Sequence, residues 1–167
     1  PALLMADVRA YLRTLVLSSQ SLVEILAKAR ALLKADLGTD RFITLLFAKL
    51  DPARRAWEYI NAGHPEGLVI APDGRIKTTM DAGASALGID GGAAEAVPIR
   101  IQLEAGDMIL LLSDGVAEAR SPADEEFGEA RVLEIVRREI KRPAAEIIQA
   151  LLDEVRSFCG AGGLQDD

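Results

Sequence analysis

The segment that decides the fold is FITLLFAKL, residues 42–50. It is a nearly continuous apolar run, rich in strand-forming residues and too short for an independent helix, so it predicts a strand buried on both faces. Residues 51–55, Asp-Pro-Ala-Arg-Arg, have the composition of a turn. Residues 56–61 then return as a second strand. The centre of the chain therefore predicts an antiparallel hairpin.

Further strands are predicted at residues 67–71, 75–80, 99–103 and 108–112. The second of these is a candidate to pair back onto the first. Apolar and polar residues alternate in the third, which predicts a half-exposed strand, whereas the fourth is apolar throughout and predicts a strongly buried one. Residues 81–97 are rich in Gly and Ala and predict a surface loop.

Helical periodicity flanks the strands on both sides. Apolar residues recur at helical spacing near the start of the chain and again after Ser21, which forms a capping-box pattern with Glu24. Gly38 is the predicted stop of the second helix. Residues 127–140 predict another helix, and Pro143 opens a last one.

Strands in succession with helices segregated to the ends define an α+β fold, and two helices before and after the strands predict helical layers on both faces of the β structure. We expect a single domain over residues 1–167. Its parts are a helical pair at 1–37, mainly strands at 42–116 and C-terminal helices at 127–159.

Composition excludes several classes of function. The chain has 167 residues and a net charge of −7, and no Lys/Arg stripe is visible, which argues against a nucleic-acid or anionic-membrane surface. No stretch approaches the ~20 apolar residues of a membrane span, so no membrane insertion is expected. Cys159 is the single cysteine, so no internal disulfide can form, and a cytoplasmic location is the natural expectation.

Carboxylates at two places suggest a metal site. Asp114, in Ser113-Asp114-Gly115, comes at the end of a predicted buried strand, where a carboxylate is held rigidly for a hard divalent cation. The alternative is an ordinary turn aspartate followed by Gly115. Asp166 and Asp167 are adjacent carboxylates that repel each other, and a metal is one reason to keep them together. The alternative is a solvated acidic terminus.

The only histidine, His64, lies in Asn61-Ala62-Gly63-His64-Pro65. This segment follows a strand and precedes a proline, where a loop presents a side chain. A lone histidine is more often a surface or hydrogen-bonded residue than a ligand, so both interpretations stay open.

In combination and order, these motifs resemble the sporulation stage II protein E type of the metal-dependent protein phosphatase (PPM) family. The resemblance extends over essentially the whole chain. The matching segments are residues 42–47 and 59–65, Leu103-x-x-Gly106-Asp107 leading into residues 112–120, Phe127-Gly128, Gly162-Gly163-x-x-Asp166-Asp167, and the opening Pro1-Ala2-Leu3-Leu4-Met5.

The resemblance implies an α-β-β-α sandwich of two antiparallel sheets flanked by helices. It also implies two Mn²⁺ or Mg²⁺ ions, held by aspartates, that activate a water for in-line attack on phosphorus. Asp114 and Asp166 match the family's metal aspartates and are the predicted catalytic residues. Asp167 and Gly115, beside them, are further candidates for metal contact. His64 stands where relatives carry an aspartate that helps to hold an extra metal.

The chain departs from the family pattern at both ends. The family's first metal aspartate lies just before the Pro-Ala helix, and its last strand follows the Asp pair. Neither falls within residues 1–167. The resemblance therefore describes a domain cropped at both ends, and we expect the chain by itself to bind metal poorly and to have little activity.

The resemblance also implies a substrate and a setting. Phosphatases of this type dephosphorylate phosphoserine or phosphothreonine on anti-sigma-factor antagonists. They thereby regulate sigma factors, including those of the stress response. They usually follow a sensor or receiver domain in a longer parent chain. Residues 2–37 are the expected coupling element and a candidate homodimer surface.

Two alternatives compete with the phosphatase. The first is a catalytically inactive interaction module of the same fold, against which the retention of Asp114 and Asp166 argues. The second is a generic α+β regulatory domain in which these aspartates lie far apart on the surface. The phosphatase interpretation places the two carboxylates within roughly 4–7 Å of each other, as ligands of neighbouring metals.

Overall fold

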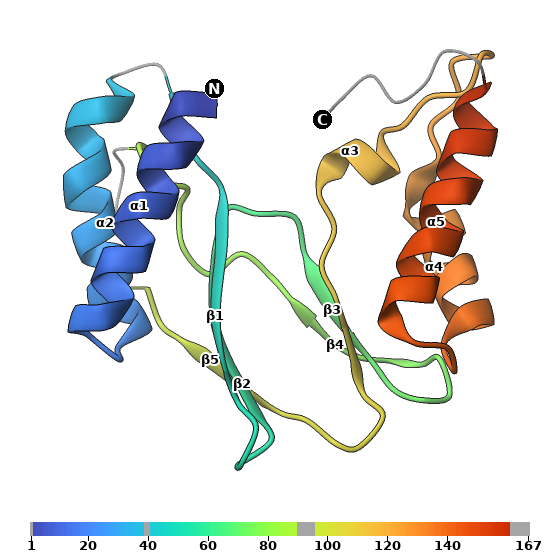
Figure 1. Ribbon diagram of the computed structural model, residues 1–167, viewed down its shortest axis with the longest axis horizontal. Helices are drawn as coiled ribbons and strands as arrows, with labels where there is room; N and C mark the ends of the chain where they lie inside the picture. Colours follow the sequence, from blue (N-terminus) through green and yellow to red (C-terminus); the bar gives the residue numbers. More distant parts are fainter. Residues whose placement is uncertain (1, 39–40, 90–95, 161–167) are drawn as a thin grey trace. The chain divides into compact units, whose positions relative to one another are not determined.

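The computed structural model describes residues 2–38, 41–89 and 96–160 (Figure 1). By its internal contacts the chain divides into two compact units. The first consists of Pro1–His64 and Asp81–Glu104, and the second of Pro65–Met80 and Ala105–Asp167. In the described ranges each unit contains a three-stranded antiparallel sheet and its own helices, which confirms the predicted α+β class. The expectation of a single domain stays a prediction.

The first unit is built on the predicted hairpin. Strand β1 (Leu45–Asp51) pairs antiparallel with β2 (Ala56–Ala62), and β5 (Ile99–Gln102) pairs with the other side of β2. The sheet order is β1-β2-β5. The hairpin is thus confirmed, whereas β5, predicted to be half-exposed, is exposed at Ile99, Arg100 and Gln102 and half-buried only at Ile101.

Burial within this sheet follows position rather than hydrophobicity. Strand β2 is central and mostly buried, whereas β1 lies at an edge, is half-buried over Leu45–Ala48 and is exposed at Lys49 and Leu50. The prediction that this apolar run is buried on both faces was therefore wrong. An edge strand has one neighbour in its sheet, and an apolar run alone does not reveal which strand is central.

Helices α1 (Ala2–Ser18) and α2 (Leu22–Leu37) cover one face of this sheet. The Ser21 side chain accepts a hydrogen bond from the Glu24 amide at 3.3 Å, which satisfies one of the free N–H groups at the start of α2. The reciprocal half of the capping box is replaced, because the Glu24 carboxylate accepts from Ser19 Oγ at 2.7 Å. Gly38, with φ of 66°, ends α2 as predicted.

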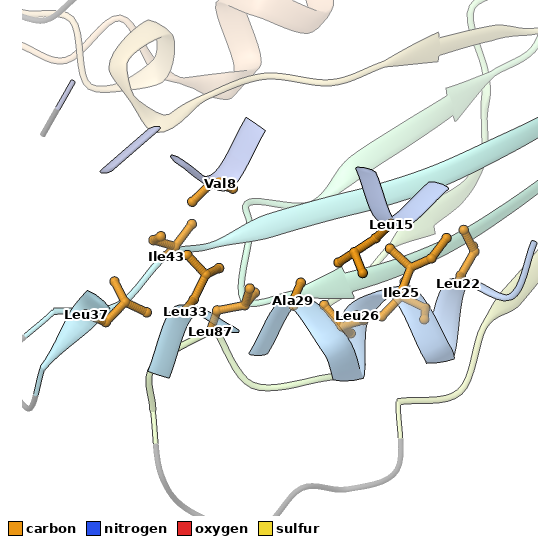
Figure 2. Close-up of a cluster of buried hydrophobic side chains, with 12 residues drawn as sticks. Val8, Leu15, Leu22, Ile25, Leu26, Ala29, Leu33, Leu37, Ile43 and Leu87 are labelled. Carbon is orange, nitrogen blue, oxygen red and sulfur yellow. The ribbon is translucent and has the colours of Figure 1, made fainter. Parts of the chain in front are cut away.

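The first core forms where these helices meet the sheet. Figure 2 shows side chains of α1 and α2 converging with Ile43 and Leu87, and Ala29 is fully buried between them. Ile43 and Leu87 also exchange backbone hydrogen bonds of 2.8 Å, so the loop after β4 is tied to the segment before β1. The buried residues of this cluster are Val8, Leu15, Leu22, Ile25, Leu26, Ala29, Leu33, Leu37, Ile43, Ile60, Ala62 and Leu87.

The second unit contains β3 (Gly67–Ile70), β4 (Ile76–Met80) and β6 (Met108–Leu110) in the order β4-β3-β6. Strand β4 pairs back onto β3, as the sequence indicated. Strand β6 is shorter than predicted and half-buried rather than strongly buried. As in the first sheet, the central strand, here β3, is the most buried and the edge strands are less so.

Helices α4 (Gly128–Glu139) and α5 (Ala144–Cys159) pack their apolar faces against this second sheet. Val132, Val136 and Val155 are at most 1% exposed. A four-residue helix, α3 (Asp114–Ala117), follows β6 and was not predicted. Of the helices in the described ranges, none combines the length and hydrophobicity that crossing a bilayer requires.

Candidate active site

Asp114 lies at the first position of α3, directly after the segment that leaves β6. Ser113 before it is extended, with φ of −83° and ψ of 159°, so the chain changes direction at this point. The Asp114 Oδ1 atom accepts a hydrogen bond from the Gly115 amide at 3.0 Å, and the Asp114 carbonyl accepts from the Glu118 amide at 2.8 Å. The side chain is exposed. The short segment after β6 thus presents a carboxylate to solvent at the start of α3.

Strand β6 is fixed at its start by a buried ion pair. Lys77 Nζ of β4 lies 2.7 Å from Asp107 Oδ2, and the Asp107 side chain is only 1% exposed. Because β3 lies between β4 and β6 in the sheet, this pair joins the two edge strands around the central one. From the sequence, Asp107 was named only as part of the motif that leads into residues 112–120, and this role was missed. The sequence feature that could have indicated this role is a carboxylate directly before an apolar strand.

A further contact set holds the region after α3. Arg131 of α4 donates to the carbonyls of Glu126 and Phe127 at 2.8 Å each, and its guanidinium lies 4.7 Å from the centre of the Phe158 ring. Phe127 and Phe158 also make an edge-to-face contact with ring centres 5.3 Å apart. Arg131 therefore links the loop before α4 to the C-terminal end of α5.

A cavity of about 240 Å³ opens beside Asp114, and we call it the Asp114 cavity. Its floor is apolar, and four carboxylates line it. All of its lining residues belong to the second unit. They are Pro65, Glu66, Leu68, Leu110, Leu112, Ser113, Asp114, Ala117, Glu118, Glu129, Val132 and Leu133.

Gly115 lies inside α3, where the sequence suggested a turn. Its amide is used by Asp114 Oδ1, so its carbonyl is the group it can offer to a cation. The φ angle of Gly115 is not positive, so the residue adopts an ordinary helical conformation here.

His64 lies in a loop that is organised by Asn61, a residue that sequence reasoning passed over. Asn61 is 1% exposed; its Oδ1 accepts from the His64 amide at 2.8 Å and its Nδ2 donates to the His64 carbonyl at 3.0 Å. The Asn61 carbonyl also accepts from the amides of Gly83 and Ala84. A polar residue at the end of a buried strand was the available signal.

The His64 ring itself is partly engaged. Its Nδ1 lies 3.3 Å from Thr44 Oγ1, a separation that allows a weak hydrogen bond and leaves Nε2 as the nitrogen for any other ligand. His64 belongs to the first unit and Asp114 to the second. A role for His64 near the metals therefore stays a hypothesis.

The described part of the site fits a hard divalent cation only in part. Asp114 offers oxygen atoms, which Mn²⁺ and Mg²⁺ prefer, and no Lys or Arg of the described ranges forms an ion pair with it. Within those same ranges, however, no three His, Cys, Asp or Glu residues are gathered closely enough to hold a metal. Asp166 and Asp167 lie outside the described residues, so the predicted spacing of 4–7 Å stays a prediction.

A comparison with protein families identifies the chain. The family model described as Stage II sporulation protein E matches residues 1–167, and the chain belongs to this family of phosphatase domains. Protein IcfG of Synechocystis sp. is 32% identical over 93 residues, which cover 56% of this chain and 14% of that relative. The chain thus spans a small part of that protein's length.

Solved structures agree on the fold. The SiaA-PP2C domain of Pseudomonas aeruginosa matches 99% of this chain and 66% of its own, with a TM-score of 0.83 and 19% identity. The structure of the RsbU and RsbW domains of Rv1364c from Mycobacterium tuberculosis matches 92% of this chain and 41% of its own length, with a TM-score of 0.72 and 24% identity. The structure of the PP2C phosphatase domain of SpoIIE from Bacillus subtilis, with a fragment of its regulatory domain, matches 97% of this chain and 46% of its own length. Its TM-score is 0.76 and its identity is 18%.

Proposed function

We propose that this chain is part of a metal-dependent protein serine/threonine phosphatase that acts on a phosphorylated regulatory protein in a partner-switching pathway. The observation that carries the proposal is the placement of Asp114 in a chain of this family. A sheet edge fixed by the Lys77–Asp107 pair ends in an exposed carboxylate that has no cation partner among the described residues.

Asp114, Asp166 and Asp167 would hold the metals, with the Gly115 carbonyl and His64 as further candidates. Two divalent cations would supply Lewis-acid activation of a water and neutralise the phosphoryl oxygens. The chain's own contribution is positioning. The Gly115 amide orients the Asp114 carboxylate through Oδ1 and leaves Oδ2 for coordination, and the loop around His64 is held by Asn61.

No side chain needs to act as a nucleophile. Cys159, the single cysteine, is 4% exposed within the core of the second unit, which suits a packed thiol rather than a reactive one. Direct attack by water without a phosphoenzyme is therefore the proposed route for phosphate release.

The proposed substrate is phosphoserine or phosphothreonine of an anti-sigma-factor antagonist. The likeness to the RsbU-containing structure and membership of the stage II sporulation protein E family support this choice. A cytoplasmic location and an upstream sensor or receiver domain in the parent chain belong to the same proposal.

Helices α1 and α2 are the proposed coupling and homodimer element. Their outer surface exposes large apolar side chains, including Leu17, which is 88% exposed, and Met5, which is 56% exposed. Apolar surface of this kind is typical of an interaction site. A sedimentation experiment that finds the full-length protein monomeric at all concentrations would contradict the homodimer.

The test of the proposed function is phosphate release from a phosphoserine peptide by the full-length protein, with Mn²⁺ and with EDTA. We expect metal-dependent release that Asp114→Asn reduces by at least about 100-fold, more than the 10–100-fold typical of losing an outer-shell partner. Asp124→Asn is the control, because it removes another exposed carboxylate of the same unit, one that pairs with Arg120, at a left-handed position that asparagine tolerates.

The control variant should retain wild-type release. Equal loss in both variants would contradict the role of Asp114. No release by the wild type with any divalent cation would favour the inactive interaction module instead.

A further inference from the structure

The Asp114 cavity combines an apolar floor with an acidic rim. The floor is made by leucines and by Val132, and the rim by Glu66, Asp114, Glu118 and Glu129, all with exposed side chains. Among the residues that the structure describes, no Lys or Arg lines it. We propose that this cavity docks a segment of the phosphorylated partner protein in which an apolar side chain is flanked by Lys or Arg, an inference that rests on the proposed function.

The floor has room for an apolar side chain. Leu68, Leu110 and Leu133 pack on the second core but remain partly exposed toward the cavity, whereas Val132 is completely buried. The volume of about 240 Å³ exceeds the ~150 Å³ of an engineered apolar cavity that binds benzene. An inserted leucine or phenylalanine side chain would cover the exposed leucine surface.

The rim offers carboxylates that no ion pair within the described residues neutralises. Among the described residues, none of the four rim carboxylates forms an ion pair. The arginines of the adjoining loop and helix make their direct contacts elsewhere: Arg120 pairs with Asp124 and Glu126 at 2.9 and 2.7 Å, and Arg131 binds backbone carbonyls. Glu118 is close enough to Arg120 to interact with its charge, but forms no ion pair with it. Carboxylates left without an internal partner are complementary to a basic segment.

Asp114 is the proposed metal ligand, and the spacing of the other three rim carboxylates favours separate positive charges over one shared metal ion. Within the described ranges no three acidic or histidine side chains are close enough to share a cation. The rim therefore distributes its charge around the floor, as a peptide with basic residues on both sides of an apolar anchor requires. The net charge of −7 adds long-range attraction for such a segment.

Fluorescence anisotropy of labelled peptides tests the docking directly, with the full-length protein in EDTA. The probe is Arg-Arg-Leu-Leu-Arg-Arg, compared with Arg-Arg-Ser-Ser-Arg-Arg and Glu-Glu-Leu-Leu-Glu-Glu. We expect the first peptide to bind most tightly, the serine peptide more weakly because it leaves the floor open, and the acidic peptide not at all. Binding of the first should weaken between about 50 mM and about 500 mM salt, because salt screens exposed charges.

The decisive variant is the double substitution Glu118→Gln with Glu129→Gln. It should weaken binding of the basic leucine peptide about fivefold, as expected for the loss of two exposed charge pairs. Glu134→Gln is the matched control, since Glu134 is an exposed glutamate of α4 that does not line the cavity. Melting temperatures of all variants, together with the salt series on the wild type, separate lost docking from lost folding.

Equal binding by the double variant and the wild type would overturn the inference, as would equal binding of the acidic peptide or failure of all three peptides to bind. The assay needs neither metal nor turnover. Hydrolysis of p-nitrophenyl phosphate by the wild type with Mn²⁺ reports the proposed function separately. Docking without hydrolysis would support the inference and count against the phosphatase, and hydrolysis without docking would do the reverse.

Discussion

The two helix pairs of this chain are built in different ways. Helices α4 and α5 bury their apolar faces against their own sheet and carry ion pairs on the outside. Arg138 of α4 pairs with Glu154 of α5 at 3.0 Å, and Arg142 of the turn between the helices pairs with Glu146 at 2.8 Å. Helices α1 and α2 also bury a face, yet they leave large apolar side chains exposed at Met5, Val16, Leu17 and Leu32. On α4 and α5, Ile148 is the one large apolar residue whose side chain is exposed.

The difference suggests a division of labour. The α4–α5 pair has a mainly polar, ion-paired outer surface and serves as the scaffold that supports β6 and Asp114. The α1–α2 pair retains apolar surface for another partner, as its proposed role in coupling and dimerisation requires. Each of the following changes weakens one side of this comparison.

The largest expected effect comes from the core of the α1–α2 pair. Leu33→Ala should lower the free energy of unfolding by about 3 kcal/mol, because Leu33 is 1% exposed and its removal leaves a cavity. Leu17→Ala should change it by less than about 0.5 kcal/mol, because Leu17 is already in solvent. Urea denaturation measures both. Equal losses would mean that the outer face of this pair contributes to the fold.

The next effect tests the scaffold. Arg131→Ala should cost about 1–2 kcal/mol, because it removes two hydrogen bonds to carbonyls and the stacking on Phe158. Arg131→Lys should recover part of the loss, and Arg156→Ala, at an exposed position on α5, should cost much less. If all three variants unfold at the same urea concentration, Arg131 does not link the loop to α5.

Much of the fold was predictable from the sequence, and the errors in the prediction have physical causes. The central hairpin, the cap at Ser21 and the stop at Gly38 depend on local chemistry, which a sequence records. The burial of β1 depends on its edge position, which is a property of the sheet and not of the segment. Helix α3 is too short to show periodicity, and Asn61 was missed because its role appears only when its loop closes around it.

The predicted site shows the same limit. Asp114 was found because its strand and its Ser-Asp-Gly motif are adjacent in sequence. The partner of Asp107 lies 30 residues away on another strand, so no local pattern reveals it. The grouping of four rim carboxylates around an apolar floor likewise arises only from the packing of α3 and α4 near β3 and β6.

A smaller effect separates the starts of the two helix pairs. Ser21→Ala should cost about 0.5–1 kcal/mol through the lost hydrogen bond to the Glu24 amide, and Ser21→Asp should retain most of it. The N-cap residues of α4 and α5, Phe127 and Pro143, make no side-chain cap hydrogen bond, so these helices have no equivalent dependence. Thermal unfolding measures the change, and no difference between the two variants would exclude the capping role.

The smallest effect is a pH dependence on the ion-paired face. Hydrogen bonds from Arg138 and Arg142 lower the pKa of Glu139 below its usual value. The stabilisation is therefore present above the pKa of the unfolded chain, about 4.3, and is lost as the pH falls through the lowered folded pKa. Glu139→Gln should reduce stability slightly at pH 7 and leave it unchanged in strong acid. A deficit that persists in strong acid would point to lost packing instead.

The central claim is that β6 and α3 present Asp114 as a metal ligand. An anomalous-difference map from crystals of the full-length protein soaked in MnCl₂ tests it most directly. The account predicts a manganese peak within coordinating distance of an Asp114 carboxylate oxygen, with Asp166 also bound. Manganese peaks elsewhere, with Asp114 still pointing into solvent, would contradict it.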